Sequence, residues 1–406
     1  MTDEREPARA TPSFPEGFRW GAATAAHQIE GGNWNNDWWA WEHTPGSAAR
    51  VPSGDACGSW EHWGRDVELC RRLGLDHYRF SLEWSRIEPE DGLWSSAAVG
   101  HYHDQCQALL DAGIEPVVTL HHFTTPRWVA ARGGWEEPET ARRFAAYCER
   151  AAAELAPVLR RVCTINEPNV VAVAGYLAGT FPPGRQDVEA RRRANATLAD
   201  AHRQAVDAVR AAAPGVPVGL TLSMSAYEAV DGGEAKLDQI RHRMEDEFLA
   251  ATEGDDFLGV QAYSRTRVGP GGAVAPDPGV RLVETMGYEF WPAALEATVR
   301  RAWEVTSGRV PLIVTENGIA AEDDATRIEY VSEALAGLAR CIADGIDVRG
   351  YTYWTLLDNF EWALGYRPRF GLAGVDRTTF ERTLKPSGEW FADVVRANGP
   401  VPAPTG

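Results

Sequence analysis

Short runs of apolar, β-branched residues alternate along the chain with longer segments in which apolar residues recur every three or four positions. The short runs predict strands, and they lie at residues 19–24, 77–84, 115–123, 161–167, 218–224, 257–264, 311–316 and 348–357. The longer segments predict amphipathic helices, at about residues 64–74, 98–113, 138–155, 191–213, 234–253, 291–307, 325–345 and 388–397. Gly74, Gly113 and Gly345 follow three of these helices, where a left-handed glycine commonly ends a helix.

The predicted strands are too uniformly apolar for an antiparallel sheet with one wet face, so a parallel sheet covered by helices is favoured. Eight strand-then-helix units without a linker or repeat predict an α/β fold, a single closed (β/α)8 TIM barrel over residues 14–399. Residues 1–13 are expected to form a disordered tail and residues 400–406 a C-terminal tail. A doubly wound sheet is disfavoured because "GAATAAHQIEGG" lacks the G-x-G-x-x-G spacing. The stretch 269–279 is expected to be a flexible loop.

Composition and charge narrow the choice of partners. The formal net charge of -18 repels nucleic acid and anionic lipid. No apolar run reaches the roughly 18 residues of a spanning helix, and the acidic, Pro-rich N-terminus does not resemble a signal peptide. A cytoplasmic protein is expected. The six cysteines form no C-x-x-C pair and are expected to be reduced core residues. Oligomeric state stays open.

Polar and aromatic residues collect at the carboxyl ends of the predicted strands, where (β/α)8 enzymes carry their chemistry. These residues are Gln28, Glu30, Arg79, Trp84, His121, His122, Asn166, Glu167, Tyr263, Glu316, Trp354, Asp358, Glu361 and Trp362. Because the strand ends of a barrel share one rim, the sequence predicts that these side chains surround one pocket.

Glu167 and Glu316 end the fourth and seventh strands, in "TINEPN" and "IVTENG". Two carboxyl groups across a pocket are the minimum for cleaving a glycosidic bond, one as acid and the other as nucleophile or base. Their like charges in an aromatic pocket should separate the two pKa values and keep one group protonated near neutral pH. The competing interpretation of each glutamate alone is a helix N-cap or a rim ion pair.

Arg79 predicts which carboxyl group is which. A guanidinium beside Glu316 would keep that group ionised as the nucleophile, which leaves Glu167 as acid and then base. Pro168 is expected to keep Glu167 in an extended conformation at the end of its strand.

Several aromatic and polar residues suit a sugar ligand. Trp354 and Trp362 can stack on the C–H faces of a sugar ring while Glu361 accepts hydrogen bonds from its hydroxyls. His121 and His122 are adjacent, so in a strand they face opposite sides and only one can reach the pocket. The sequence contains no H-E-x-x-H and no G-x-S-x-G, so neither a metal site nor a serine triad is expected. No cofactor is implied, because two glutamates supply the proton and covalent chemistry.

Taken in order, the motifs resemble glycoside hydrolase family 1, the β-glucosidase family of retaining (β/α)8 enzymes. The similarity covers most of the chain, and its motifs are "FPEGFRWGAATAAHQIEGG", "YRFSLEWSRIEP", "TLHHFTTPRW", "TINEPN", "TENG" and "YWTLLDNFEWALGYRPRFGL".

The resemblance implies hydrolysis of terminal, non-reducing β-D-glycosides by double displacement, with Glu167 as acid/base and Glu316 as nucleophile. It implies that Arg79 and Tyr263 orient the nucleophile. By the same resemblance the sugar contacts Gln28, His122, Asn166, Tyr263, Trp354, Glu361, Trp362 and Phe370. The partner would be a small-molecule β-glycoside or oligosaccharide. A β-galactosidase or β-fucosidase, a hydrolase of natural-product glycosides and a transglycosylase stay open, and a non-catalytic sugar-binding barrel is the alternative of another class.

Some positions depart from the family pattern. The usual N-Y-Y after strand six is Gln261, Ala262 and Tyr263 here, and Phe123 replaces the usual Trp. The segment between 264 and 288 looks trimmed. These departures affect the aglycone side and the surroundings of the nucleophile. The 6-phosphoglycoside branch carries Ser and Lys after strand eight, whereas this chain has Glu361 and Trp362, so an unphosphorylated sugar is expected.

Overall fold

The computed structural model describes residues 14–402. Its centre is a barrel of eight parallel strands that closes in the order β1-β13-β12-β7-β5-β4-β3-β2. The strands are β1 (Arg19–Ala23), β2 (His77–Ser81), β3 (Glu115–His121), β4 (Arg161–Asn166), β5 (Val218–Ser223), β7 (Phe257–Gln261), β12 (Leu312–Asn317) and β13 (Val348–Trp354). The predicted fold and all eight predicted strands are therefore confirmed. The tail expected at 1–13, and residues 403–406 of the C-terminal tail, lie outside the described residues.

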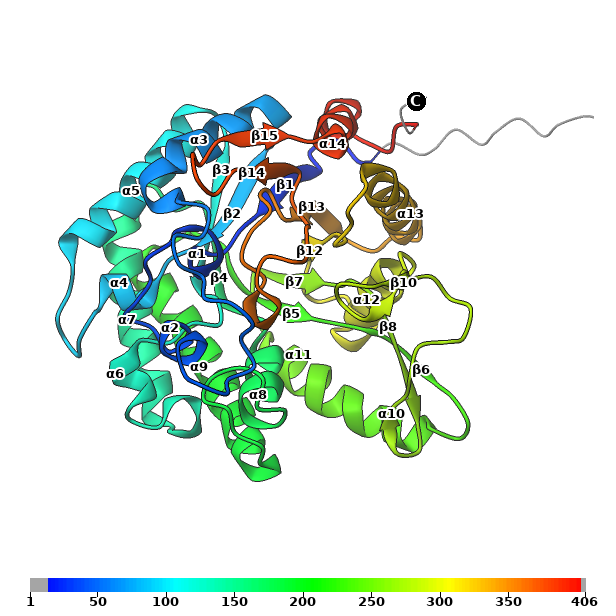
Figure 1. Cartoon of the computed structure of the whole chain (residues 1–406), viewed down its shortest axis with the longest axis horizontal. Coiled ribbons are helices and arrows are strands. Elements are labelled where there is room, and N and C mark those ends of the chain that lie inside the picture. The colour runs from blue at the N-terminus through cyan, green and yellow to red at the C-terminus, as the bar shows by residue number, and fades with distance from the viewer. Residues whose placement is uncertain (1–13, 403–406) are drawn as a thin grey trace, which may run out of the picture.

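Long helices ring the barrel, with α3, α5 and α7 to the left of the strands and α12 and α13 to the right in Figure 1. They are α3 (Ser59–Leu73), α5 (Ser96–Asp111), α7 (Glu139–Leu155), α9 (Val188–Ala212), α12 (Ala294–Val305), α13 (Asp324–Ala343) and α14 (Pro386–Ala397). The helix predicted at 234–253 is interrupted: α10 (Glu234–Arg241) leads through a π-helical turn, His242–Asp246, into α11 (Glu247–Ala251). The three glycines predicted to end helices have φ values of 71°, 76° and 88°.

The sequence patterns did not predict the short elements that follow the strands. The short helices are α1 (Ala26–Ile29), α2 (Asp37–Glu42), α4 (Trp84–Ile87), α6 (Arg127–Ala130) and α8 (Pro168–Tyr176), with 3-10 turns at Gly134–Glu136 and Trp362–Leu364. Three small sheets are formed by β6 (Ala226–Ala229), β8 (Arg265–Gly269) and β9 (Gly272–Ala273), by β10 (Leu282–Val283) and β11 (Tyr288–Glu289), and by β14 (Ala373–Val375) and β15 (Arg382–Leu384). The expectation of a loop throughout 269–279 is wrong, because β9 pairs there with β8.

Two apolar regions stabilise the barrel. The main core lies between strands and helices, and a separate cluster of Val117, Cys163, Phe257 and Ile313 comes from four of the strands. Gly259 on β7 permits close packing, since a Cβ atom there would lie 2.6 Å from Thr315 Oγ1. All six cysteines are buried and none forms a disulfide, which confirms that prediction. Within residues 14–402, no helix has the length and apolar character needed to cross a membrane.

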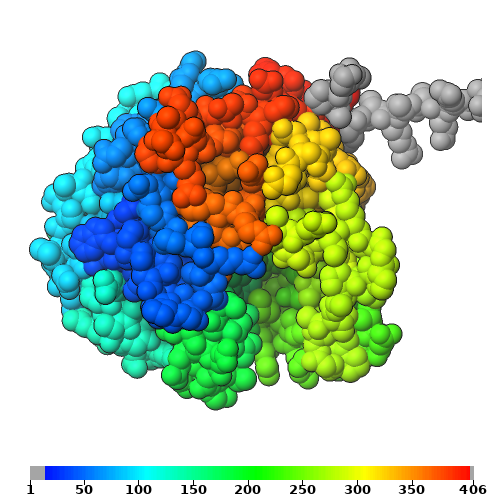
Figure 2. Space-filling model, viewed as in Figure 1, coloured from blue at the N-terminus to red at the C-terminus, as the bar shows by residue number. Residues whose placement is uncertain are grey.

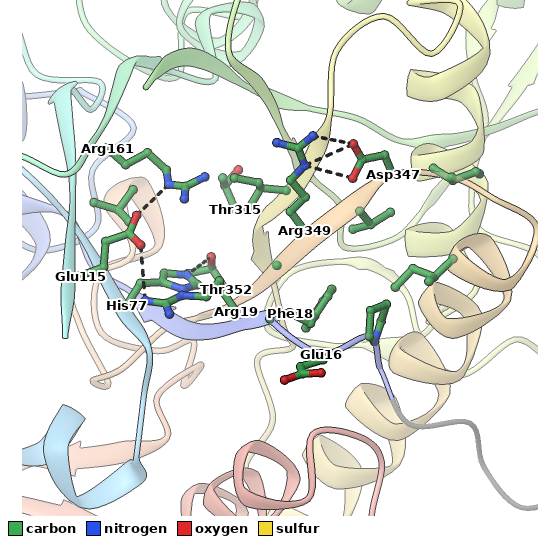
Figure 3. Close-up of a pocket in the computed structure, with 18 residues that line it drawn as sticks. Glu16, Phe18, Arg19, His77, Glu115, Arg161, Thr315, Asp347, Arg349 and Thr352 are labelled. Atoms are coloured by element: carbon green, nitrogen blue, oxygen red, sulfur yellow. Dashed lines mark hydrogen bonds and ion pairs between the residues drawn. The ribbon is translucent and has the colours of Figure 1, made fainter. Parts of the chain in front are cut away.

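A cavity of about 420 Å³ opens at the amino ends of the strands (Figure 3). Four of its charged side chains form ion pairs: Arg161 lies 2.9 Å from Glu115, and Arg349 lies 2.8 Å from Asp347. Burial and neighbouring arginines lower the pKa of His77 to about 3, so this histidine is neutral at physiological pH. The cavity is lined by neither Glu167 nor Glu316.

Candidate active site

A second cavity, of about 280 Å³, lies at the carboxyl ends of the strands. The molecular surface is hollowed there, where green, yellow-green and orange segments meet (Figure 2). Nine predicted site residues line it: His122, Asn166, Glu167, Tyr263, Glu316, Trp354, Glu361, Trp362 and Phe370. The other two, Gln28 and Arg79, are completely buried behind the lining. All eleven are therefore gathered at one pocket, although their roles toward a sugar stay predictions.

Donors hold both carboxylate oxygens of Glu316, the side chain near the end of β12. Arg79 Nη1 donates to Glu316 Oε1 at 2.7 Å, and the Tyr263 hydroxyl donates to Oε2 at 2.6 Å. Arg79 comes from β2, and the ion pair is almost fully shielded from solvent. A carboxylate that receives a charge-assisted bond on one side and a hydroxyl bond on the other is fixed in place and favoured in its ionised form.

Glu167 lies between β4 and α8. Its φ and ψ are 45° and 58°, a left-handed conformation, and Pro168 opens α8 directly after it. The expectation of an extended Glu167 is therefore wrong. A proline disfavours the right-handed helical region in the residue before it, and the abrupt strand-to-helix turn selects the left-handed region. The Glu167 side chain makes no capping bond to α8, so the N-cap interpretation fails.

Burial raises the pKa of both carboxyl groups, but their surroundings separate them. At Glu316 the Arg79 charge and the Tyr263 hydroxyl oppose that rise. At Glu167 the repulsion of Glu316 adds to burial and raises the pKa to about 8, against an opposing bond from Ser223. These surroundings favour the proton on Glu167 and the negative charge on Glu316.

A directional chain of hydrogen bonds runs from Arg79 through Asn166 to His122. Arg79 Nη2 donates to Asn166 Oδ1 at 2.5 Å, and because a guanidinium only donates, the Asn166 oxygen must face it. The amide nitrogen of Asn166 then lies 3.2 Å from His122 Nε2, which must accept. Burial lowers the pKa of His122 well below its ordinary value, so the ring is neutral with its proton on Nδ1.

Glu361, Trp354 and Trp362 also line the cavity. Gln28 Nε2 donates to Glu361 Oε2 at 3.2 Å, and burial followed by the repulsion of Glu316 raises the pKa of Glu361 to about 8. The His122 ring stacks on both indoles, with centroids 5.8 Å from Trp354 and 6.1 Å from Trp362. The pocket thus offers aromatic faces beside hydrogen-bonding groups, the combination that suits a sugar ring.

Strained backbone also collects at this pocket. Phe123, Glu167 and Trp362 all have positive φ, of 70°, 45° and 50°, and all three line the cavity. Such conformations cost on the order of 1–3 kcal/mol each and tend to cluster at functional sites. The Phe123 and Trp362 rings are 4.9 Å apart, so packing between them helps to maintain both conformations.

Four residues expected at the rim lie elsewhere. Trp84 is buried against Tyr147 at 5.1 Å. Glu30 pairs with Arg86 at 2.9 Å, and Asp358 pairs with Lys385 at 2.8 Å. His121 packs against Trp135, with ring centroids 5.1 Å apart, on the other side of β3 from His122, as the alternation of a strand predicts. For Trp84, Glu30 and Asp358 the prediction of a common pocket is wrong. A position near the end of a strand does not determine whether the side chain points into the pocket.

The sequence did not identify the outer wall of the cavity, which consists of Val170, Phe181, Ser223, Met286, Tyr288, Ala363 and Leu364. Most of these residues lie on α8 or in connecting segments that show no strand or helix periodicity. Among the described residues lining the cavity there is no Lys or Arg, so a phosphate group would find no cation. Nor do three or more potential metal ligands gather anywhere in residues 14–402.

A barrel that presents two buried carboxyl groups with separated pKa values beside aromatic faces has the architecture of a glycoside hydrolase. Comparison with known proteins gives the family. The family model of glycosyl hydrolase family 1 matches residues 10–259 and 276–400, and the chain belongs to this family. The match is interrupted at residues 260–275, which include the Q-A-Y stretch at 261–263.

Curated relatives match over nearly their full lengths. The chain is 32% identical to "Beta-glucosidase A" of Thermotoga maritima, covering 95% of this chain and 98% of that protein. It is 36% identical to "Thermostable beta-glucosidase B" of Thermobispora bispora, covering 95% and 91%. It is 34% identical to "Bifunctional beta-D-glucosidase/beta-D-fucosidase" of Bifidobacterium breve, covering 94% and 98%.

Solved structures agree in fold. A beta-glycosidase crystal structure has a TM-score of 0.88 at 43% identity, covering 97% of this chain and 99% of that chain. The beta-glucosidase from Thermotoga maritima in complex with noeuromycin has a TM-score of 0.88 at 30% identity, covering 96% and 100%.

Proposed function

We propose that the protein is a retaining β-glucosidase that removes terminal β-D-glucosyl groups by double displacement. The observation that carries this proposal is the unequal environment of the two carboxyl groups. Glu316 is held by Arg79 and Tyr263, whereas burial and repulsion raise the pKa of Glu167 to about 8. The names of the relatives in Thermotoga and Thermobispora support the β-glucoside as substrate.

In the first step the Glu316 carboxylate attacks the anomeric carbon while Glu167 gives its proton to the glycosidic oxygen. The bond to the aglycone breaks, the alcohol leaves, and the sugar is esterified to Glu316. In the second step Glu167, now ionised, takes a proton from water, whose oxygen displaces Glu316 from the anomeric carbon. Two inversions give net retention, and we expect the two carboxyl groups to lie about 5–5.5 Å apart.

The sugar would occupy the inner half of the cavity. Trp354 and Trp362 offer their faces, and Gln28 and Glu361 offer hydrogen-bonding atoms. The free N–H of Asn166, whose oxygen is turned to Arg79, is directed to the 2-hydroxyl, a contact that strengthens in the transition state. Without a cation in the described lining, an unphosphorylated sugar fits better than a sugar phosphate.

A broader β-glycosidase specificity is the second candidate. The relative in Bifidobacterium breve whose name includes a beta-D-fucosidase supports it. Transglycosylation uses the same first step and differs only in whether an alcohol replaces water in the second.

The test is hydrolysis of 4-nitrophenyl β-glucoside by the wild type and by E316A, with NMR of the first sugar anomer released. We expect colour only with the wild type, and the β-anomer first. An α-anomer first, or equal activity in both proteins, would overturn the proposal. Parallel assays with β-galactoside and β-fucoside decide between the narrow and the broad specificity.

A further inference from the structure

Gln261 is a completely buried polar residue to which the proposed mechanism gives no role. It ends β7, and its partners across the sheet are Ser223 on β5 and Glu316 on β12. Its side chain therefore lies beside the proposed nucleophile, on the neighbouring strand.

The hydrogen bonds around Asn166 fix the orientation of the Gln261 amide. Because Arg79 turns the Asn166 oxygen toward itself, any other group that meets this oxygen must donate. Gln261 Nε2 lies 3.2 Å from Asn166 Oδ1, so the NH2 group of Gln261 faces Asn166. The carbonyl oxygen of Gln261 is buried and has no hydrogen-bond partner among the described residues.

Arg79 links the Asn166 oxygen to Glu316, because its Nη2 donates to Asn166 Oδ1 at 2.5 Å and its Nη1 donates to Glu316 Oε1 at 2.7 Å. The Gln261 side chain is also among the neighbours that lower the pKa of Glu316 against the effect of burial, after Arg79 and Tyr263.

We propose that Gln261 is a positioning residue, whose NH2 group holds the Asn166 oxygen on the Arg79 guanidinium and thereby fixes Asn166 relative to Glu316. The consequence is that binding of the sugar's 2-hydroxyl and alignment of the nucleophile depend on each other. The inference rests on the proposed function, since it takes Asn166 as the partner of the 2-hydroxyl and Glu316 as the attacking group.

Two substitutions distinguish the hydrogen bonding of the Gln261 amide from the packing of its side chain. Q261M keeps a side chain of similar length without donors, and Q261N keeps the amide with a shorter reach. As a matched control, T352V removes a buried hydrogen bond to His77 at the amino end of the barrel, away from the pocket. The kinetic substrates are 4-nitrophenyl β-glucoside and its 2-deoxy analogue.

For Q261M we expect kcat/KM on the glucoside to fall about 3- to 10-fold, the range for losing one hydrogen bond between neutral groups. The loss on the 2-deoxy substrate should be smaller, by about threefold or more, because groups in one network couple. The acidic limb of the pH profile should move to higher pH, since Glu316 loses a neighbour that lowers its pKa. Q261N should recover part of each effect, and T352V should change neither the substrate ratio nor the acidic limb.

Equal losses on both substrates with an unmoved acidic limb would overturn the inference and leave Gln261 as packing. That result leaves the proposed function intact if the wild type is active and E316A is not. NMR titration of carbon-13 glutamate carboxyls gives a readout that needs no turnover: the lower apparent pKa of the Glu167–Glu316 pair should rise in Q261M. An unchanged titration would also refute the inference, whereas an inactive wild type would refute the proposed function first.

Discussion

Arg79 Nη1 lies 2.7 Å from Glu316 Oε1, and neither side chain is exposed to solvent by more than 5%. This buried ion pair distinguishes Glu316 from Glu167, because no described cation lies within ion-pair distance of the Glu167 carboxyl. Burial strongly disfavours the charged form of a carboxyl group that has no partner. A cation beside the group offsets much of that cost. Which carboxyl group acts as the acid and which as the nucleophile therefore depends on one arginine from β2.

Removal of the arginine should be severe. Breaking a buried pair by deleting one partner costs about 3–5 kcal/mol, so R79M should unfold at a lower temperature. Its kcat/KM should fall about 100-fold or more, because tenfold in rate corresponds to only about 1.4 kcal/mol. R79K keeps the charge but lacks the planar guanidinium whose nitrogens bond both Glu316 and Asn166. Its kcat/KM and unfolding temperature should lie between those of the wild type and R79M. Aryl glucoside kinetics and thermal unfolding check this, and wild-type kinetics in R79M would contradict it.

The pH profile should follow Glu167. Its pKa of about 8 predicts that kcat/KM falls above about pH 8, as the acid loses its proton before the first step. The lower limb should report ionisation of Glu316. In E167Q the fall at high pH should disappear along with most of the activity toward poor leaving groups. A high-pH limb that persists in E167Q would assign it to another group, such as Glu361.

The thermal stability of the folded protein should also depend on the protonation of Glu167. Folding raises the pKa of Glu167 from 4.5 to about 8, so the folded state favours the protonated form. The contribution of this protonation to the stability of the folded state is complete below about pH 4.5 and is lost as pH rises toward 8. E167Q should therefore match the wild type at pH 4.5 and become more stable by several degrees at pH 8. Thermal unfolding across this range checks it, with E149Q, at an exposed position, as the control.

The outer half of the cavity should favour an apolar aglycone. Phe181 packs against Phe123 at 5.5 Å and against Trp362 at 6.2 Å, and Val170, Met286 and Leu364 complete this wall. We expect aryl and long alkyl β-glucosides to exceed cellobiose in kcat/KM. F181A should reduce that preference about 10-fold, since burying a large apolar side chain is worth about 1.5–3 kcal/mol. The cellobiose rate serves as the internal reference, and an unchanged ratio would contradict the assignment.

The cysteines should be inert in the folded protein. All six are buried, and burial raises the pKa of Cys106 to about 12 and that of Cys341 to about 11, so little nucleophilic thiolate forms. A colorimetric thiol reagent should detect none in the native protein and six after unfolding in denaturant. Rapid reaction before unfolding would show that one of them is accessible.

The uniformly apolar runs predicted the barrel strands well, because a strand that is buried on both faces is apolar along its whole length. The site residues at strand ends, such as Asn166 and Glu316, could be found by following each strand to its last residue. Trp84 and Asp358 could not be placed that way, because the chain turns after a strand and direction is then set by tertiary packing. Phe181 lies in a connecting segment without periodicity, so only the fold reveals it as part of the wall.

The backbone at Glu167 shows a second limit. Proline at 168 disfavours the right-handed region for the preceding residue, and an extended conformation is the usual alternative. The left-handed conformation observed is selected because α8 begins immediately after β4. Which conformation Glu167 adopts depends on how α8 packs, so the local sequence does not predict it.

The most direct measurement is to trap the intermediate. A 2-deoxy-2-fluoro-β-glucosyl fluoride should react once, and peptide mass spectrometry should find the fluorosugar on the peptide containing Glu316. E167A should still become labelled, because the fluoride leaving group needs no acid, whereas E316A should not. A label on Glu167, or a turnover with no covalent sugar and an inverted product, would contradict the assignment of the nucleophile.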